Sequence, residues 1–122
     1  MIVEENPIFL KCYYDCLFLS GYRINGVKVY REAANFFIAF RPEMIILGSC
    51  RSETRRLNFA RELVQLEPRC KIILLSPKAK DSERTEKIGF DLILSAKISR
   101  EKFLDGVGAL THTKNFEEIV AR

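Results

Sequence analysis

Short apolar runs alternate along this chain with longer segments in which apolar residues recur at helical spacing. Runs that are mostly apolar, as expected for strands buried on both faces of a parallel sheet, lie at residues 1–6, 44–47, 71–76 and 91–95. A weaker run at 22–29 is interrupted by Gly26. The segments between the runs predict helices at residues 6–20, 31–40, 53–67, 80–90 and 99–110.

The predicted helices carry recognisable ends. Asn6 suits the N-cap of the first helix, Pro7 its first turn and Gly21 its end. The second helix stops before Pro42. Five strands alternating with five helices through short loops predict an α/β protein of flavodoxin-like architecture. We expect a doubly wound sheet of five parallel strands in the order 2-1-3-4-5, with helices on both faces.

Composition and charge narrow the class of protein. A chain of 122 residues is long enough for one domain, and no apolar run approaches the ~20 residues of a membrane span. The net charge of +4 permits an acidic partner without requiring one. Four cysteines without a C-x-x-C pair, and the single histidine His112, favour reduced thiols and a cytoplasmic protein without a zinc site. We expect no cofactor.

The carboxyl ends of the predicted strands are where this fold usually places its chemistry. Several segments there resemble the receiver domain of two-component response regulators: "IVEENP", "RPEMIIL", "EPRCKIILLS" and "GFDLILSAK". The resemblance covers about residues 1–110 and is spread over many segments rather than one motif. It implies the fold predicted above and a regulatory function.

The resemblance also implies that the family's phosphorylation pocket is degenerate here. Gly48 stands where receivers carry the aspartate that accepts the phosphoryl group, and glycine has no nucleophile. The other matched positions are the acidic pair Glu4 and Glu5, the hydroxyl Ser76, the lysine position at Ala96 with Lys97 one place late, and the switch aromatic replaced by Ile93. We therefore expect a pseudo-receiver that is not an enzyme, has no catalytic residue and binds no metal.

Other polar residues near these strand ends have simpler interpretations. Ser49, Cys50 and Ser52 lack a nearby base that would activate them. Glu4 and Glu5 are expected to form a solvated strand end, which Lys97 could neutralise through space. The arginines Arg51, Arg55, Arg56 and Arg61 predict a solvated basic face on the third helix, with nucleic-acid binding as the less favoured alternative.

The last residues suggest a second domain. The segment "NFEEIVAR", with Asn115 as a predicted N-cap, resembles the entry into the AAA+ ATPase domain of sigma-54-dependent activators. We therefore divide the chain into a receiver-like domain at 1–111 and a linker with the start of another domain at 112–122. The resemblance implies control of such an activator by contact or dimerisation. A stand-alone adaptor and a small-ligand sensor that uses the vacated pocket remain alternatives.

The expected partners are a second copy of the chain and the downstream ATPase domain, with no direct contact to nucleic acid or membrane. Receivers of this kind commonly pair through the fourth helix, fifth strand and fifth helix, which places the candidate interface at Lys87, Ile93, Lys102 and Phe103. Gly106 and Gly108 weaken the fifth helix. Close packing in a dimer and early termination of the helix are both consistent with these glycines.

Overall fold

The strands form one parallel sheet in the order β2-β1-β3-β4-β5, as predicted. The computed structural model describes residues 1–76 and 88–121, with side chains described as far as residue 111. The elements are β1 (Ile2–Val3), α1 (Pro7–Leu19), β2 (Gly26–Val27), α2 (Tyr30–Phe40), β3 (Met44–Leu47), α3 (Glu53–Leu66), β4 (Lys71–Ser76), β5 (Leu92–Ser95) and α5 (Arg100–Ala121). Most of the helix predicted at 80–90, including Lys87, lies outside the described residues.

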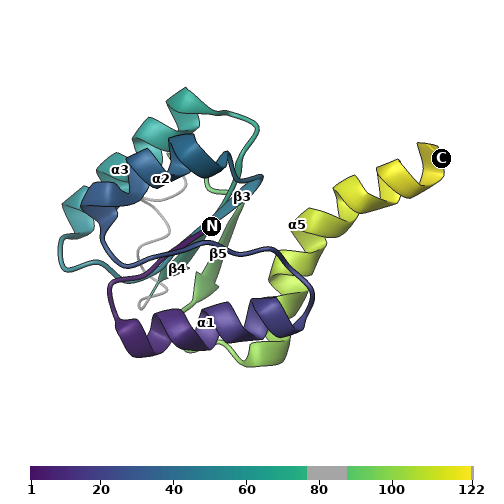
Figure 1. Ribbon diagram of the computed structural model, residues 1–122, viewed down its shortest axis with the longest axis horizontal. Coiled ribbons are helices and arrows are strands. Elements are labelled where there is room, and N and C mark those ends of the chain that lie inside the picture. Colours follow the sequence, from purple (N-terminus) through teal and green to yellow (C-terminus); the bar gives the residue numbers. More distant parts are fainter. Residues whose placement is uncertain (77–87, 122) are drawn as a thin grey trace.

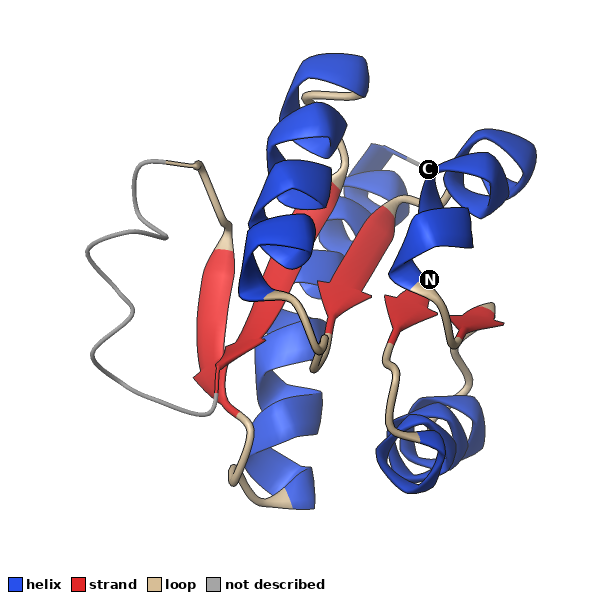
Figure 2. Cartoon of the chain, turned by 90° about the vertical axis from the view of Figure 1, so that its left-hand side faces the viewer, coloured by secondary structure: helices blue, strands red, loops and turns tan. Residues whose placement is uncertain are grey.

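Helices cover both faces of the sheet (Figure 1). α1 and α5 pack on one face, where Ile2, Leu10 and Phe103 belong to one apolar core. α2 and α3 pack on the other face, where Phe37 and Leu63 belong to a second core. Figure 2 shows the strands side by side, with β2 at one edge and β5 at the other. The flavodoxin-like architecture is therefore confirmed.

Local sequence signals explain most helix ends. The Asn6 side chain accepts hydrogen bonds from the backbone N–H groups of Ile8 and Phe9, at 3.0 and 3.1 Å, and so caps α1. Gly21, which follows α1, has a φ of 91°, in the left-handed region that glycine tolerates. Ser52 caps α3 by accepting a hydrogen bond from the Arg55 N–H at 3.1 Å. Arg41 ends α2 with a left-handed φ of 48°.

The fifth helix departs from the prediction. α5 runs from Arg100 to Ala121 without a break, so the expected end near residue 110 and the new helix capped by Asn115 are not seen. Its final turns extend away from the sheet (Figure 1). Gly106 brings α5 close to β5, because a Cβ atom there would lie 3.0 Å from Leu92 Cδ2 and 3.1 Å from Leu94 Cδ1. The close packing at Gly106 is therefore between α5 and β5 of the same chain. The domain division at 111/112 stays a prediction.

None of the helices in the described part of the chain combines the length and apolar character needed to cross a bilayer.

Candidate functional site

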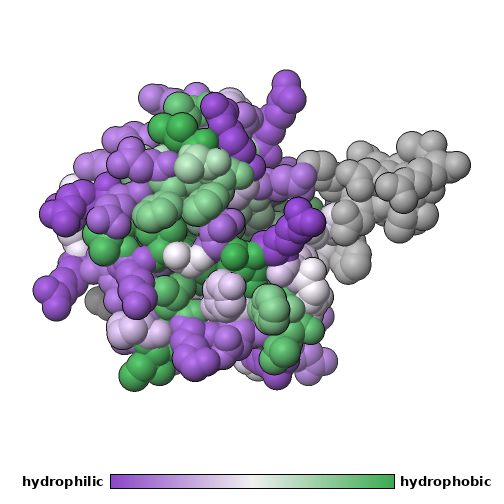
Figure 3. All heavy atoms as spheres, in the orientation of Figure 1, coloured by the Kyte–Doolittle hydropathy of each residue, from purple (hydrophilic) through white to green (hydrophobic). Residues whose placement is uncertain are grey.

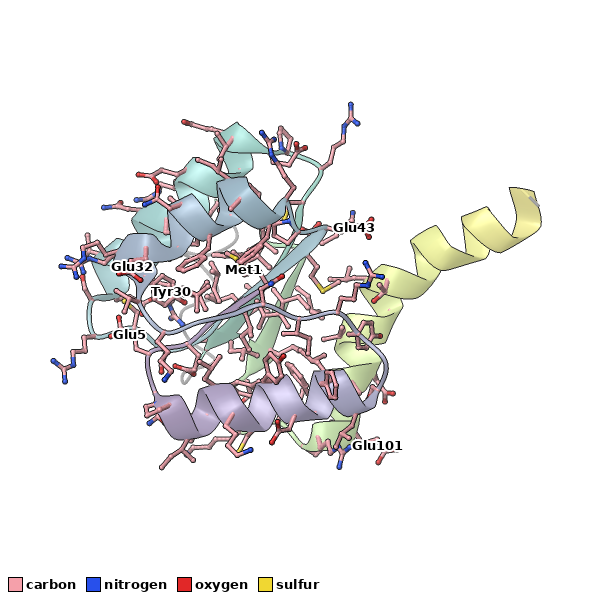
Figure 4. The ribbon with its side chains drawn as sticks, viewed as in Figure 1. Met1, Glu5, Tyr30, Glu32, Glu43 and Glu101 are labelled. Atoms are coloured by element: carbon pink, nitrogen blue, oxygen red, sulfur yellow. The ribbon has the colours of Figure 1, made fainter. Side chains whose placement is uncertain are left out.

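The carboxyl ends of β1, β3, β4 and β5 meet at one edge of the sheet, because all the strands are parallel. Glu5 and Tyr30 lie at this end of the molecule, and Glu43 lies at the opposite end (Figure 4). The positions that the sequence identified at the ends of β1, β3 and β4 are therefore brought together. We call this region the carboxyl-edge site.

Glu4 is the central acidic group of the carboxyl-edge site, and only 1% of it is exposed. Its Oε1 accepts a hydrogen bond from the Ser49 N–H at 3.1 Å, and its Oε2 accepts one from the Asn6 N–H at 3.1 Å. The Ser49 hydroxyl also donates to Oε2. The expectation of a solvated Glu4 is therefore wrong, because local donors replace the water that burial removes.

Gly48 leaves the space into which this carboxylate fits. A Cβ atom on residue 48 would lie 2.7 Å from Glu4 Oε1 and 2.9 Å from Glu4 Cδ, closer than real Cβ contacts. The Gly48 N–H donates to the Val3 carbonyl at 2.7 Å, which holds the backbone beside β1. A side chain at residue 48 and the observed position of Glu4 thus exclude each other.

A buried cation supports the same backbone from the side of α3. Arg56 is 1% exposed, and its Nη1 donates to the carbonyls of Gly48 and Leu75, at 3.1 and 2.9 Å. Its Nη2 forms a two-pronged ion pair with Glu53, at 2.7 and 2.8 Å. Its Nε has no hydrogen-bond partner among the described residues. Arg56 therefore does not belong to the predicted solvated basic face, whereas Arg51, Arg55 and Arg61 are exposed.

Tyr30 completes the contacts of the Gly48 carbonyl. Its hydroxyl donates to that oxygen at 2.7 Å, with the Val3 carbonyl at 3.4 Å also within reach. Burial raises the pKa of Tyr30 well above its ordinary value, although nearby Arg56 opposes the rise. The tyrosine thus remains a neutral donor. Together, Arg56 and Tyr30 hold the end of β3 in one position.

The remaining matched positions are spread over β4 and β5. Ser76 is buried, and its carbonyl accepts a hydrogen bond from the Ala96 N–H at 2.9 Å. Ala96 and Lys97 are exposed, and no ion pair joins Lys97 to Glu4 or Glu5 within the described residues. The suggested neutralisation by Lys97 therefore involves no direct ion pair, and its through-space form stays a prediction.

The residues that follow β3 have structural roles rather than the arrangement of a nucleophile. The Ser49 hydroxyl is bound to Glu4, and Ser52 caps α3. Partial burial and a hydrogen bond to Glu5 raise the pKa of the Cys50 thiol to about 11, so the thiol stays protonated at neutral pH. Glu5 is half-buried, and its Oε1 accepts a hydrogen bond from the Arg51 N–H at 3.4 Å.

One of the residues predicted to form an interface on the β5 side is buried. Phe103 is 2% exposed, and its ring packs on Tyr13 with centroids 5.3 Å apart. Its assignment to an interface is wrong, because it belongs to the core between α1, α5 and the sheet. Ile93 is half-buried against the other core, and Lys102 is exposed. Lys87 lies outside the described residues.

The residues present do not fit the divalent cation on which receiver chemistry depends. Gly48 offers no carboxylate, the Glu4 oxygens are occupied by protein donors, and the Arg56 guanidinium already binds the Gly48 carbonyl. In the described residues, no group of three or more His, Cys, Asp or Glu side chains could hold a metal ion. We therefore assign no chemical step to a metal here.

Sequence reasoning missed Arg56, Tyr30 and the role of Ser49. One signal for Arg56 was available, since it lies four and seven residues before Ala60 and Leu63, on the buried face of α3. No signal linked Tyr30 to these strand ends or Ser49 to Glu4, because these partners are distant in the sequence.

Comparison with protein-family models gave no match, and no curated protein matches the chain at a significant level. Solved structures match its fold over most of its length. A CheY-like response regulator receiver domain protein from Methanospirillum hungatei JF-1 has a TM-score of 0.84 at 14% identity, with 95% of this chain and 94% of that chain covered. The signal receiver domain of a histidine kinase from Syntrophus aciditrophicus has a TM-score of 0.78 at 25% identity, with coverages of 89% and 86%.

A third match is to part of a larger protein. NtrX from Brucella abortus, whose crystal structure is a complex with ATP, matches with a TM-score of 0.81 at 11% identity. The match covers 98% of this chain but only 28% of that chain. The chain therefore has the fold of response regulator receiver domains, both those solved alone and one within a longer protein.

Proposed function

We propose that this chain is a receiver-like regulatory domain that phosphorylation does not operate. The observation that carries the proposal is the position of Glu4, whose carboxylate occupies the space beside Gly48 that a phosphoryl-accepting side chain would need. An aspartyl phosphate requires a carboxylate nucleophile and a cation free to neutralise the phosphoryl oxygens. Here Gly48 offers no nucleophile, and Arg56, a buried cation bound to its carbonyl, is also bound to the Leu75 carbonyl and to Glu53.

The domain is proposed to act by contact and not by catalysis. The hydrogen bonds of Glu4, Arg56 and Tyr30 hold the ends of β1 and β3 in one arrangement, and the proposed output is a surface that partners recognise in that arrangement. Four free cysteines are consistent with the reducing cytoplasm, where we place the protein. A ligand sensor in the pocket beside Gly48 is less well supported, because Glu4 fills that space.

We further propose that the domain regulates an attached AAA+ sigma-54 activator. Two observations support this part: the resemblance of residues 115–122 to the entry of that ATPase domain, and the fold match to a 28% portion of NtrX. Self-association through the β5 side also stays a proposal. It now depends on Lys102 and Ile93, since Phe103 is buried. A Walker A segment encoded downstream of Arg122 is expected, and its absence would favour the stand-alone adaptor.

The direct test is incubation with acetyl phosphate and Mg²⁺ followed by intact mass spectrometry. The wild-type chain is expected to keep its mass, because Gly48 cannot accept the phosphoryl group. The variant Gly48→Asp is expected not to switch even if it is labelled, because Ala96 and Ile93 replace the lysine and the aromatic residue of receivers. A Mg²⁺-dependent phosphoryl adduct on the wild-type chain would contradict the proposal.

A further inference from the structure

The open edge of the sheet at β2 presents an apolar and basic surface that the carboxyl-edge site does not use. In Figure 2, β2 lies at the outer edge of the sheet, with α2 on one side and α1 on the other. We define the β2 face by the exposed side chains around this edge: Phe18, Arg23, Lys28, Phe36, Phe40 and Arg41. Figure 3 views this face, on which apolar patches over α1 and α2 are separated by more polar residues.

Two stacked aromatic pairs flank the edge strand. On α1, the rings of Tyr14 and Phe18 stack with centroids 6.2 Å apart, although Phe18 remains 60% exposed. On α2, Phe36 and Phe40 stack at 5.7 Å, and Phe40 is 45% exposed. Contiguous apolar patches on monomeric proteins often mark interaction sites, and aromatic residues are enriched among the anchors of protein interfaces.

A groove at the amino-terminal end of the sheet adjoins these features and extends from the loop before β2 to α5. It has a volume of about 560 Å³ and is lined mainly by apolar residues, among them Leu17, Ile24 and Phe40. β2 forms the adjacent edge and pairs only with β1, so one side of its backbone faces outward. An exposed strand edge can pair with an extended segment of another protein, and a neighbouring groove can hold its side chains.

The charges of the β2 face are mainly positive. From Cys16 to Arg31 the chain contains no acidic residue. Arg23, Lys28 and Arg41 form no ion pair within the described part of the chain. Nearby Asp15 pairs with Lys11 at 2.8 Å, and Glu43 at the end of the groove also has a partner. Glu32 lies one turn before Phe36 on α2 and is exposed, so one carboxylate adjoins the three cations of the face.

The charges, the stacked rings and the groove of the β2 face disfavour several possible occupants. In a symmetric dimer the same patch would face itself and bring like charges together, which disfavours a second copy. Single-stranded nucleic acid needs open ring faces for base stacking, whereas the rings of the β2 face stack on one another. A bilayer requires a protruding apolar surface, and this face contains a groove.

We propose that the β2 face binds an extended, acidic segment of a partner protein that carries aromatic or aliphatic side chains. The segment would pair with the outer edge of β2 and place apolar side chains in the groove, with its carboxylates near Arg23, Lys28 and Arg41. The inference rests on the proposed contact-based function of the domain. The proposed partner surface therefore lies at the β2 edge of the sheet, opposite the β5 side.

The test is a selection of random 15-residue peptides displayed on phage against the immobilised 122-residue chain. Retained peptides are synthesised with a fluorophore, and their affinities are measured by anisotropy. We expect them to combine acidic with aromatic or aliphatic residues and to shift amide NMR signals of residues 24–28. The double substitution Phe36→Ser with Phe40→Ser, and separately Lys28→Glu, should each weaken binding at least ~10-fold.

The matched control is Leu66→Ser, which also removes an exposed apolar side chain but lies on α3. It should leave the affinity within about twofold. Three outcomes would overturn the inference. The control could lose as much peptide affinity as the β2-face variants, the retained peptides could be basic, or the wild-type chain could retain no more phage than the Phe36→Ser/Phe40→Ser variant. The inference would also fail if the chain bound phosphatidylserine vesicles, a thymidine 15-mer or a second copy of itself, and if the Phe36→Ser/Phe40→Ser variant lost that binding. The phosphoryl test at Gly48 is separate, so failure of one proposal is distinguishable from failure of the other.

Discussion

A methyl group added at residue 48 tests how the carboxyl-edge site is built. In Gly48→Ala the new Cβ would lie 2.7 Å from Glu4 Oε1, 2.9 Å from Glu4 Cδ and 3.0 Å from the Val3 carbonyl oxygen. The backbone at Gly48 is not in the left-handed region, so alanine meets no conformational penalty there. The cost of the substitution therefore comes from displacing Glu4 and crowding Val3.

The size of the effect follows from the contacts that Glu4 loses. Its carboxylate accepts three hydrogen bonds, from the Asn6 N–H and from the N–H and hydroxyl of Ser49. A hydrogen bond to a charged group contributes about 1.5–3 kcal/mol, and overpacking of a core costs about 1–3 kcal/mol. Part of the loss is recovered if the displaced carboxylate reaches water. We therefore expect Gly48→Ala to lower the free energy of unfolding by about 2–4 kcal/mol.

Urea denaturation followed by circular dichroism measures this change, and Gly26→Ala is the matched control. A Cβ on Gly26 would lie 3.4 Å from Leu10 Cδ1, which is ordinary contact with a flexible side chain. That substitution should change stability by less than about 1 kcal/mol. A double-mutant cycle with Glu4→Ala then isolates the clash, and Gly48→Ala should cost at least ~1 kcal/mol less when the carboxylate is absent. Equal costs at the two glycines, or no coupling to Glu4, would refute the reasoning.

Three further predictions concern the groups around this site and the start of β1. Arg56→Met should destabilise the fold by about 2–4 kcal/mol in the same assay, because the Leu75 carbonyl loses a donor and the Gly48 carbonyl keeps the Tyr30 hydroxyl but loses the guanidinium. Exposed Arg55→Met should change the stability by less than about 0.5 kcal/mol, and equal effects of the two substitutions would contradict the role of Arg56. Tyr30→Phe should cost about 1 kcal/mol, and in the wild type the raised pKa of Tyr30 should delay its ionisation, followed by ultraviolet absorbance, until the protein unfolds in alkali. Burial lowers the pKa of the Met1 ammonium from 8.0 to about 6, so the folded chain binds fewer protons than the unfolded chain between these values. Stability should therefore rise by up to ~2–3 kcal/mol from pH 6 to pH 8, and acetylation of the amino group should remove this rise.

The fold could be predicted because its signals are local or repeated along the chain. The predicted strands at 44–47 and 71–76 match β3 and β4, and the Asn6 cap matches the start of α1. The order of the strands followed from the regular alternation of strands and helices. The end of α5 was misjudged because Gly106 was treated as a weak helix former, whereas it lets the helix approach Leu92 and Leu94.

The candidate site was less predictable, because its interactions join residues that are distant in sequence. That Gly48 stands at the position of the receivers' nucleophile could be proposed from the resemblance to that family. The burial of Glu4 depends on Ser49, which is 45 residues away, and the role of Arg56 depends on carbonyls at the ends of two strands. From the sequence alone, Glu4 and Arg56 are expected to be exposed, because unpaired glutamate and arginine side chains are rarely buried. Only the packed structure shows that partners are present.

The most direct test of the account is an amide NMR titration of the wild-type chain with beryllofluoride and Mg²⁺, which together mimic the phosphoryl group of activated receivers. In the proposed function, Glu4 fills the space that a phosphoryl-accepting side chain would need, and Gly48 has no side chain that could accept the group. This proposed function predicts that the signals of Gly48, Ser49 and Ser76 keep their positions throughout the titration. A second set of signals that replaces the first at these residues, and that requires both beryllofluoride and Mg²⁺, would contradict it.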